Sequence, residues 1–89
     1  AGAEALYRLG RQLRRQGAPQ TAIRELERMP SLFAGHPEWE ARSLLEQARA
    51  YRDQGETGQA VQLYDEVQQT YGGTPFAQTA QEEKRALES

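Results

Sequence analysis

The stretch from Tyr51 to Tyr71, YRDQGETGQAVQLYDEVQQTY, decides the fold. It predicts the end of one helix, a tight turn at Gly55 and a second helix whose apolar residues recur at helical spacing. A single helical hairpin cannot bury such an apolar face alone, so we expect a similar hairpin to pack beside it. The apolar residues of the second helix are Ala60, Leu63, Tyr64 and Val67.

The sequence contains this second hairpin. An offset of 38 residues places Gly17 on Gly55 and Pro37 on Pro75. A fixed period of this size is typical of helical solenoids, in which each hairpin packs on the next. The same offset aligns other identical residues, namely Leu6 with Leu44, Arg11 with Arg49, Arg14 with Arg52 and Ala22 with Ala60.

The pattern predicts an all-α protein of about five helices, arranged as antiparallel helix-turn-helix repeats. We expect one domain with repeat one at residues 1–37, repeat two at 38–74 and a terminal capping helix at 75–89. The prolines and glycines set the predicted boundaries, because proline favours the first helical turn and glycine ends a helix. The expected helices cover residues 2–16, 19–29, 37–54, 58–70 and 75–88.

Two details of the first repeat follow from residue type. Gly10 lies on the predicted apolar stripe of Leu6, Leu9 and Leu13, where a missing side chain allows another helix to approach closely. Pro30 lacks an amide hydrogen and should end or kink the second helix. We expect one extra turn over residues 31–36, which would bury Leu32 and Phe33.

Composition argues against several functional classes. The 89 residues include no cysteine and one histidine, so we expect no disulfide, no transition-metal site and no cofactor. The net charge of -2 gives no general attraction to nucleic acid, and no apolar run is long enough to enter a membrane directly. The adjacent carboxylates at 65–66 and 82–83 point in different directions on a helix, so we interpret them as solvated faces and expect no enzyme activity.

The two hairpins resemble the tetratricopeptide repeat. The resemblance implies an α-solenoid that binds a protein or peptide without catalysis. The period of 38 and the junction TYGGTPFAQTAQ are similar to bacterial cell-envelope members, which implies a periplasmic or envelope location. The first-helix pattern is carried by Leu6, Leu9, Gly10 and Leu13 and by Leu44, Gln47, Ala48 and Tyr51, and the second-helix pattern by Ala22, Leu26 and Met29 and by Ala60, Tyr64 and Val67.

In the family, the first helix of each repeat lines a concave groove, and the resemblance therefore implies a partner-binding surface. The recurring arginines would suit an acidic peptide or a C-terminal carboxylate through bidentate contacts. The alternative is a solvated face, in which the arginines could also pair with Glu46 or Asp53 of the neighbouring helix. The arginines considered for this pairing are Arg11, Arg14 and Arg15. The matching positions are Tyr7, Arg11, Arg14, Leu45, Arg49 and Arg52.

Other interpretations stay open at this point. The chain could be an architectural or oligomerising spacer of a larger bacterial envelope protein. Self-association is a further hypothesis, because residues 1–30 carry a net charge of +3 and residues 61–89 a net charge of -3. Trp39, the only tryptophan, would either pack into a junction between helices or serve as an exposed anchor for a partner.

Overall fold

Six helices make up the computed structural model, which describes residues 2–89, and no strand occurs in that part of the chain. The all-α prediction is therefore confirmed. The five expected helices are all present, and the sixth, α3, is a single short turn. The helices are α1 (Gly2–Arg15), α2 (Pro19–Leu26), α3 (Met29–Leu32), α4 (Pro37–Asp53), α5 (Thr57–Thr70) and α6 (Pro75–Glu88).

Glycine and proline set the boundaries as the sequence predicts. Gly17 and Gly55 turn the chain between the helices of each hairpin with φ of 87° and 78°, a left-handed conformation that favours glycine. Gly35 and Gly73, with φ of 85° and 83°, form a second pair at the same offset. Proline occupies the first turn of α2, α4 and α6. The 38-residue repeat is thus a repeat of backbone conformation.

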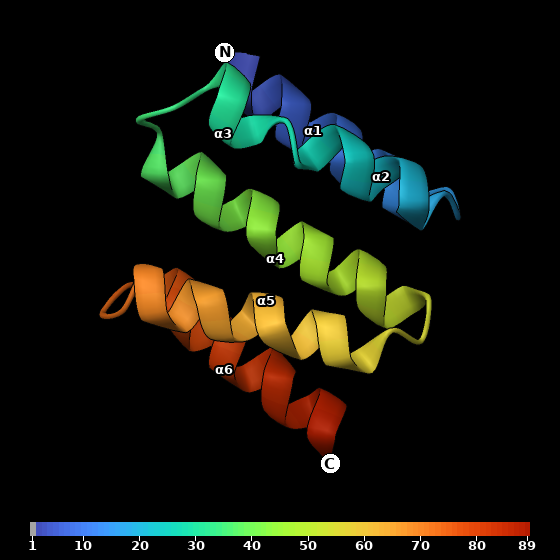
Figure 1. Ribbon diagram of the computed structural model, residues 1–89, viewed down its shortest axis with the longest axis vertical. Helices are drawn as coiled ribbons and strands as arrows, with labels where there is room; N and C mark the ends of the chain where they lie inside the picture. The colour runs from blue at the N-terminus through green and yellow to red at the C-terminus, as the bar shows by residue number, and fades with distance from the viewer. Residues whose placement is uncertain (1) are drawn as a thin grey trace.

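The two hairpins stack as a slab. In Figure 1, α2 and α5 lie in front, α1 and α6 lie behind them, and α4 lies between the two pairs. The Cα atoms span 36 × 31 × 16 Å, which is about two helices thick. Helix α4 contacts all five other helices, so it is the centre of the domain.

Within residues 2–89, two hydrophobic clusters form the core, one centred on each repeat. Ala3, Leu6 and Met29 form the smaller cluster, and Tyr7, Phe33 and Trp39 pack against it. The larger cluster joins α4, α5 and α6, and its buried members are Leu45, Ala48, Ala60, Tyr64, Val67 and Ala80. Gly10 allows α1 to approach α2, because a Cβ added there would lie 2.3 Å from Cγ of Leu26.

The end of the second helix differs from the prediction. Helix α2 stops at Leu26 instead of continuing to Met29, and Pro30 lies in the first turn of α3. Proline has no N–H to donate to the carbonyl four residues earlier. The hydroxyl of Ser43 in α4 donates to the carbonyl of Leu26 at 3.0 Å instead, and Gln47 donates to Ser43 at 3.1 Å. The buried Ser43–Gln47 pair therefore compensates for the proline.

Two leucines expected in the core are exposed. Leu9 is 45% exposed, because no helix within residues 2–89 covers that side of α1. Its repeat equivalent Gln47 is buried, because α2 packs against α4 at this position. Leu32 is 50% exposed, since the extra turn begins earlier than expected and covers only Met29–Leu32. Phe33, by contrast, packs against the core as expected.

Candidate partner-binding face

Helices α1, α4 and α6 form one face of the slab, which we call the A-face. Helix α4 contacts both α1 and α6. In Figure 1 this face points away from the viewer. All six residues predicted to bind a partner belong to α1 and α4, so the A-face is where their surroundings decide what they can do.

Four charged residues form a continuous chain across the A-face. Glu46 accepts from Nε of Arg14 at 2.8 Å and from Nη1 of Arg49 at 2.7 Å. Arg49 also donates from Nη2 to Glu83 at 2.6 Å, which carries the chain from α1 through α4 to α6. We call Arg14, Glu46, Arg49 and Glu83 the ionic ladder. Because its members come from three helices, the ladder joins the two repeats to the terminal helix.

The ionic ladder stabilises the fold, because its central carboxylate, that of Glu46, is buried. The side chain of Glu46 is 1% exposed, so its charge depends on the two guanidinium groups for stabilisation. Arg14 has a further bond to Asp53 at 3.1 Å, and Tyr64 donates its hydroxyl to Glu83 at 2.8 Å. Such paired and hydrogen-bonded charges are costly to separate, because removing one partner leaves the other unpaired.

The pKa values reflect this pairing. Burial alone would raise the pKa of Glu83, but the hydrogen bonds from Arg49 and Tyr64 and the nearby arginine charges lower it below its ordinary value. The hydrogen bond to Glu83 raises the pKa of Arg49, against the opposing effect of burial. Burial and the bond to Glu83 raise the pKa of Tyr64. Both members of the Arg49–Glu83 pair therefore stay charged at neutral pH.

A second row of side chains crosses the same helices nearer their N-termini. The rings of Tyr7 in α1 and Trp39 in α4 are tilted against each other with centroids 5.6 Å apart. The guanidinium of Arg42 lies 4.5 Å from the Trp39 ring and 5.3 Å from the ring of Phe76 in α6. Arg11 lies 5.5 Å from the Tyr7 ring. We call Tyr7, Trp39 and Phe76, with Arg11 and Arg42, the aromatic row.

The structure separates the six predicted residues into three groups. Tyr7 and Arg11 belong to the half-exposed aromatic row. Arg14 and Arg49 belong to the ionic ladder. Arg14 pairs with Glu46 and Asp53 as the alternative expected. Arg11 and Arg15, for which the same pairing was considered, form no ion pair within residues 2–89. The remaining two differ in exposure: Leu45 is a core residue, 4% exposed, whereas Arg52 is exposed and contacts Asp53 at 3.3 Å.

The role of Glu83 was not predicted from the sequence. We interpreted it as part of a solvated face, and this was wrong because it is half-buried between Arg49 and Tyr64. Asp65 is likewise paired, with Lys84 at 2.7 Å. The repeat did contain a signal for this position. A step of 38 residues leads from Tyr7 to Leu45, and a second step leads from Leu45 to Glu83, so Glu83 occupies the same predicted groove position in the third unit. Arg42 and Phe76 were also overlooked as companions of Trp39.

Within residues 2–89, no three His, Cys, Asp or Glu side chains are grouped so that they could hold a metal ion. None of the helices described there has both the length and the apolar character needed to cross a bilayer.

Comparison with known families agrees with the stacked hairpins. The tetratricopeptide repeat family matches residues 4–36 and 42–74, roughly three quarters of the chain. The two matched segments begin 38 residues apart, as the internal repeat requires. Comparison with curated proteins and with solved structures gave no significant match. On the basis of both matched repeats and their helical pairing, the chain belongs to the tetratricopeptide repeat family.

Proposed function

We propose that the chain is a non-catalytic module that binds an acidic segment of a partner protein on its A-face. Tetratricopeptide repeats are generally protein–protein interaction modules and typically lack catalysis. The proposal commits to the aromatic row as the contact surface, because the arginines of the ionic ladder already have carboxylate partners. We retain the boundaries of 1–37, 38–74 and 75–89 as the proposed repeat units.

Two arginines of the aromatic row, Arg11 and Arg42, have guanidinium groups that are available to a ligand. Arg11 forms no ion pair within residues 2–89 and lies over the Tyr7 ring. Arg42 has one carboxylate neighbour, Glu38, at 3.9 Å. A guanidinium held over a ring is positioned and keeps N–H groups for a bidentate contact. Two such groups on neighbouring helices fit a peptide with carboxylates, including a free C-terminus.

A binding measurement with labelled peptides tests the proposal. The probe is a nine-residue peptide that alternates Glu with Thr and has a free C-terminus, and fluorescence anisotropy gives its Kd. We expect Arg11→Gln with Arg42→Gln to weaken binding about tenfold, since two charge-assisted contacts are removed. Arg85→Gln is a single-charge control, because Arg85 is exposed on α6 and forms no ion pair within the described residues. Equal weakening per charge removed would contradict a specific site.

A spacer in a larger bacterial envelope protein is the second candidate role. The ionic ladder favours it, because a face whose charges satisfy each other stabilises a stack without a partner. The envelope location is supported by the sequence resemblance alone. Cell fractionation of the full protein tests the location. Absence of saturable binding by the Glu peptide, with a Kd above about 1 mM, would favour the spacer.

A further inference from the structure

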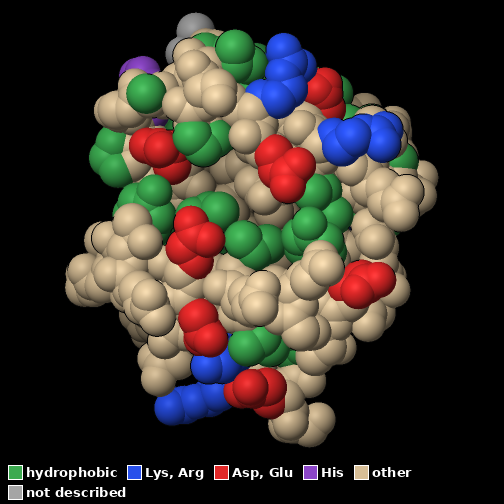
Figure 2. Space-filling model, viewed as in Figure 1, with side chains coloured by type: hydrophobic (Ala, Val, Ile, Leu, Met, Phe, Trp, Pro, Cys, Tyr) green, Lys and Arg blue, Asp and Glu red, His purple; other side chains and the backbone are tan. Residues whose placement is uncertain are grey.

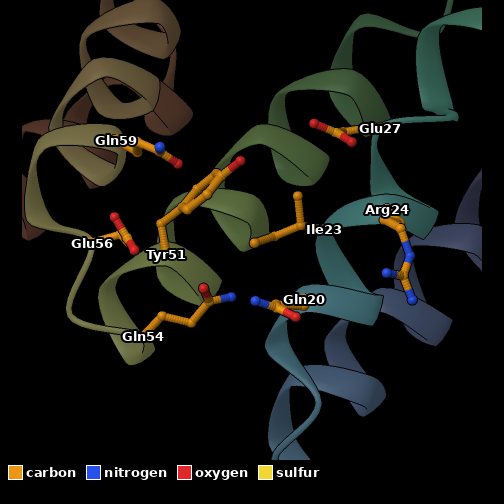
Figure 3. Close-up of a pocket in the computed structure, with 8 residues that line it drawn as sticks. All are labelled: Gln20, Ile23, Arg24, Glu27, Tyr51, Gln54, Glu56 and Gln59. Carbon is orange, nitrogen blue, oxygen red and sulfur yellow. The ribbon is translucent and has the colours of Figure 1, made fainter.

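A groove runs along the face opposite the A-face. Helices α2 and α5 form its sides, and α4 forms its floor. Three adjoining clefts make up the groove: the first two share Glu27, Tyr51 and Gln59, and the second and third share Gln47 and Glu66. We call this continuous surface the B-groove. In Figure 1 helices α2 and α5, which flank the B-groove, lie toward the viewer, and Figure 3 shows the cleft at the α4 C-terminal end of the groove.

The B-groove is acidic, and its carboxylates are unpaired. Glu27, Glu40, Glu56 and Glu66 line it, and none of them forms an ion pair within residues 2–89. Arg24 is its single basic lining residue. Figure 2 shows acidic side chains across the middle of this face and Lys and Arg side chains toward its upper and lower edges. Unpaired carboxylates along one groove attract a cationic ligand.

Glutamine side chains supply hydrogen-bonding groups along the same groove. Each amide can both donate and accept, which matches the alternating N–H and C=O groups of an extended peptide. Nε2 of Gln54 is buried and has no acceptor among the described residues. Figure 3 shows the amides of Gln54 and Gln20 pointing toward one another from opposite sides of the cleft. Gln59 and Gln62 of α5 continue the series.

The dimensions fit a short extended segment. Helix α4 has 17 residues, and at about 1.5 Å per residue it is roughly 25 Å long. An extended peptide rises about 3.3 Å per residue, so roughly seven residues would cover this length. Tyr51 and Leu63 add apolar contact surface to an otherwise polar lining.

We propose that the B-groove is a second binding site, which takes an extended segment rich in Lys or Arg from a partner protein. Charge complementarity selects this occupant: the carboxylates repel an acidic peptide or a nucleic acid and attract ammonium and guanidinium groups. The site lies on the face opposite the aromatic row, so the module would bind two segments of opposite charge. This second site does not depend on the function proposed for the A-face.

The test of the B-groove uses a cationic peptide, opposite in charge to the Glu–Thr peptide used for the A-face. The probe is a nine-residue peptide that alternates Lys with Thr, acetylated and amidated at its ends, and its Kd is measured at about 50 mM salt, where screening of charges is weak. We expect Glu27→Gln with Glu66→Gln to weaken binding at least about fivefold, because two exposed charge contacts are lost. Both residues are exposed and without ion pairs among residues 2–89, so folding should be unaffected.

The matched control is Glu82→Gln with Glu88→Gln. These residues are exposed on α6, outside the B-groove, and their replacement changes the net charge by the same amount. We expect this control to change the Kd less than twofold, and amide chemical shifts on peptide addition to map to Tyr51, Gln59 and Leu63. Equal weakening by both double variants, shifts confined to the A-face, or no saturable binding would overturn the proposal.

Discussion

Arg11 and Arg49 occupy equivalent positions of the two repeats, yet only Arg49 is held by carboxylates. Arg49 lies in α4, which has neighbours on both sides, and bonds to Glu46 and Glu83. Arg11 lies in α1, which has α4 on one side only, and contacts the Tyr7 ring. The same residue type thus stabilises the stack in the inner helix and stays available in the outer one.

Glu46 should be the most sensitive member of the ionic ladder. Glu46→Gln keeps the shape of the side chain but removes the charge that two guanidinium groups share. We expect the free energy of unfolding to fall by about 3 kcal/mol, at the lower end for a disrupted buried pair, because the glutamine oxygen can still accept a hydrogen bond. Urea denaturation would measure this loss. Glu38→Gln is the control, because its exposed pair with Arg42 at 3.9 Å should contribute less than about 0.5 kcal/mol. Equal effects would mean that the ladder adds nothing beyond a surface pair.

Gly10 should tolerate no side chain. In Gly10→Ala the new Cβ would overlap the fully buried Leu26, so we expect a loss of about 1 to 3 kcal/mol despite the better helix propensity of alanine. Gly58→Ala in α5 is the matched control, since a Cβ there meets nothing within 4 Å and should stabilise by up to about 1 kcal/mol. Thermal unfolding of both variants measures the difference. A stable Gly10→Ala protein would show that α1 and α2 are not packed this closely.

Ser43 should be required for stability, because Pro30 has no N–H to donate to the Leu26 carbonyl. Ser43→Ala removes the only hydrogen-bond donor to the Leu26 carbonyl found in the described residues and leaves the Gln47 amide without its acceptor. An unsatisfied buried polar group costs about 1 to 3 kcal/mol, and we expect a loss in that range from chemical denaturation. Ser31→Ala is the control, because Ser31 is exposed and should change stability by less than about 0.5 kcal/mol. A neutral Ser43→Ala would show that another donor replaces the hydroxyl.

Stability should fall in acid in a way that depends on Glu83. Its pKa is lowered in the folded state from an ordinary value of 4.5, so the folded protein binds this proton less tightly than the unfolded chain does. The resulting stabilisation is present above pH 4.5 and is lost as the pH falls through the lowered pKa. Urea midpoints between pH 7 and pH 3 should therefore decline more steeply for the wild type than for Glu83→Gln. Parallel declines would exclude Glu83 as a source of this dependence.

Much of the fold follows from local sequence signals. Gly17 and Gly55 require a left-handed conformation at the turns, and prolines 19, 37 and 75 favour the first turn of a helix. These are properties of single residues, so they can be predicted without knowing what packs nearby. The periodicity of the apolar residues then indicates which helix faces meet.

The remaining features depend on the position of a helix in the stack. The early end of α2 is stable because Ser43, 17 residues away, caps its carbonyl. Leu9 is exposed although its repeat equivalent Gln47 is buried, because α4 has a preceding hairpin packed on it, whereas α1 has none among the described residues. The difference in ion pairing between Arg11 and Arg49 has the same origin. A repeat pattern indicates equivalent positions but does not say which of them have neighbours.

The most direct measurement compares Arg11→Gln with Arg49→Gln in the same two assays, thermal unfolding and binding of the Glu–Thr peptide. We predict that Arg49→Gln lowers the Tm by more than about 10 °C, as a loss of about 2 to 3 kcal/mol implies for a domain of this size. Arg11→Gln should leave the Tm unchanged and weaken peptide binding by about fivefold. A large drop in the Tm for Arg11→Gln together with a stable Arg49→Gln protein would contradict the account.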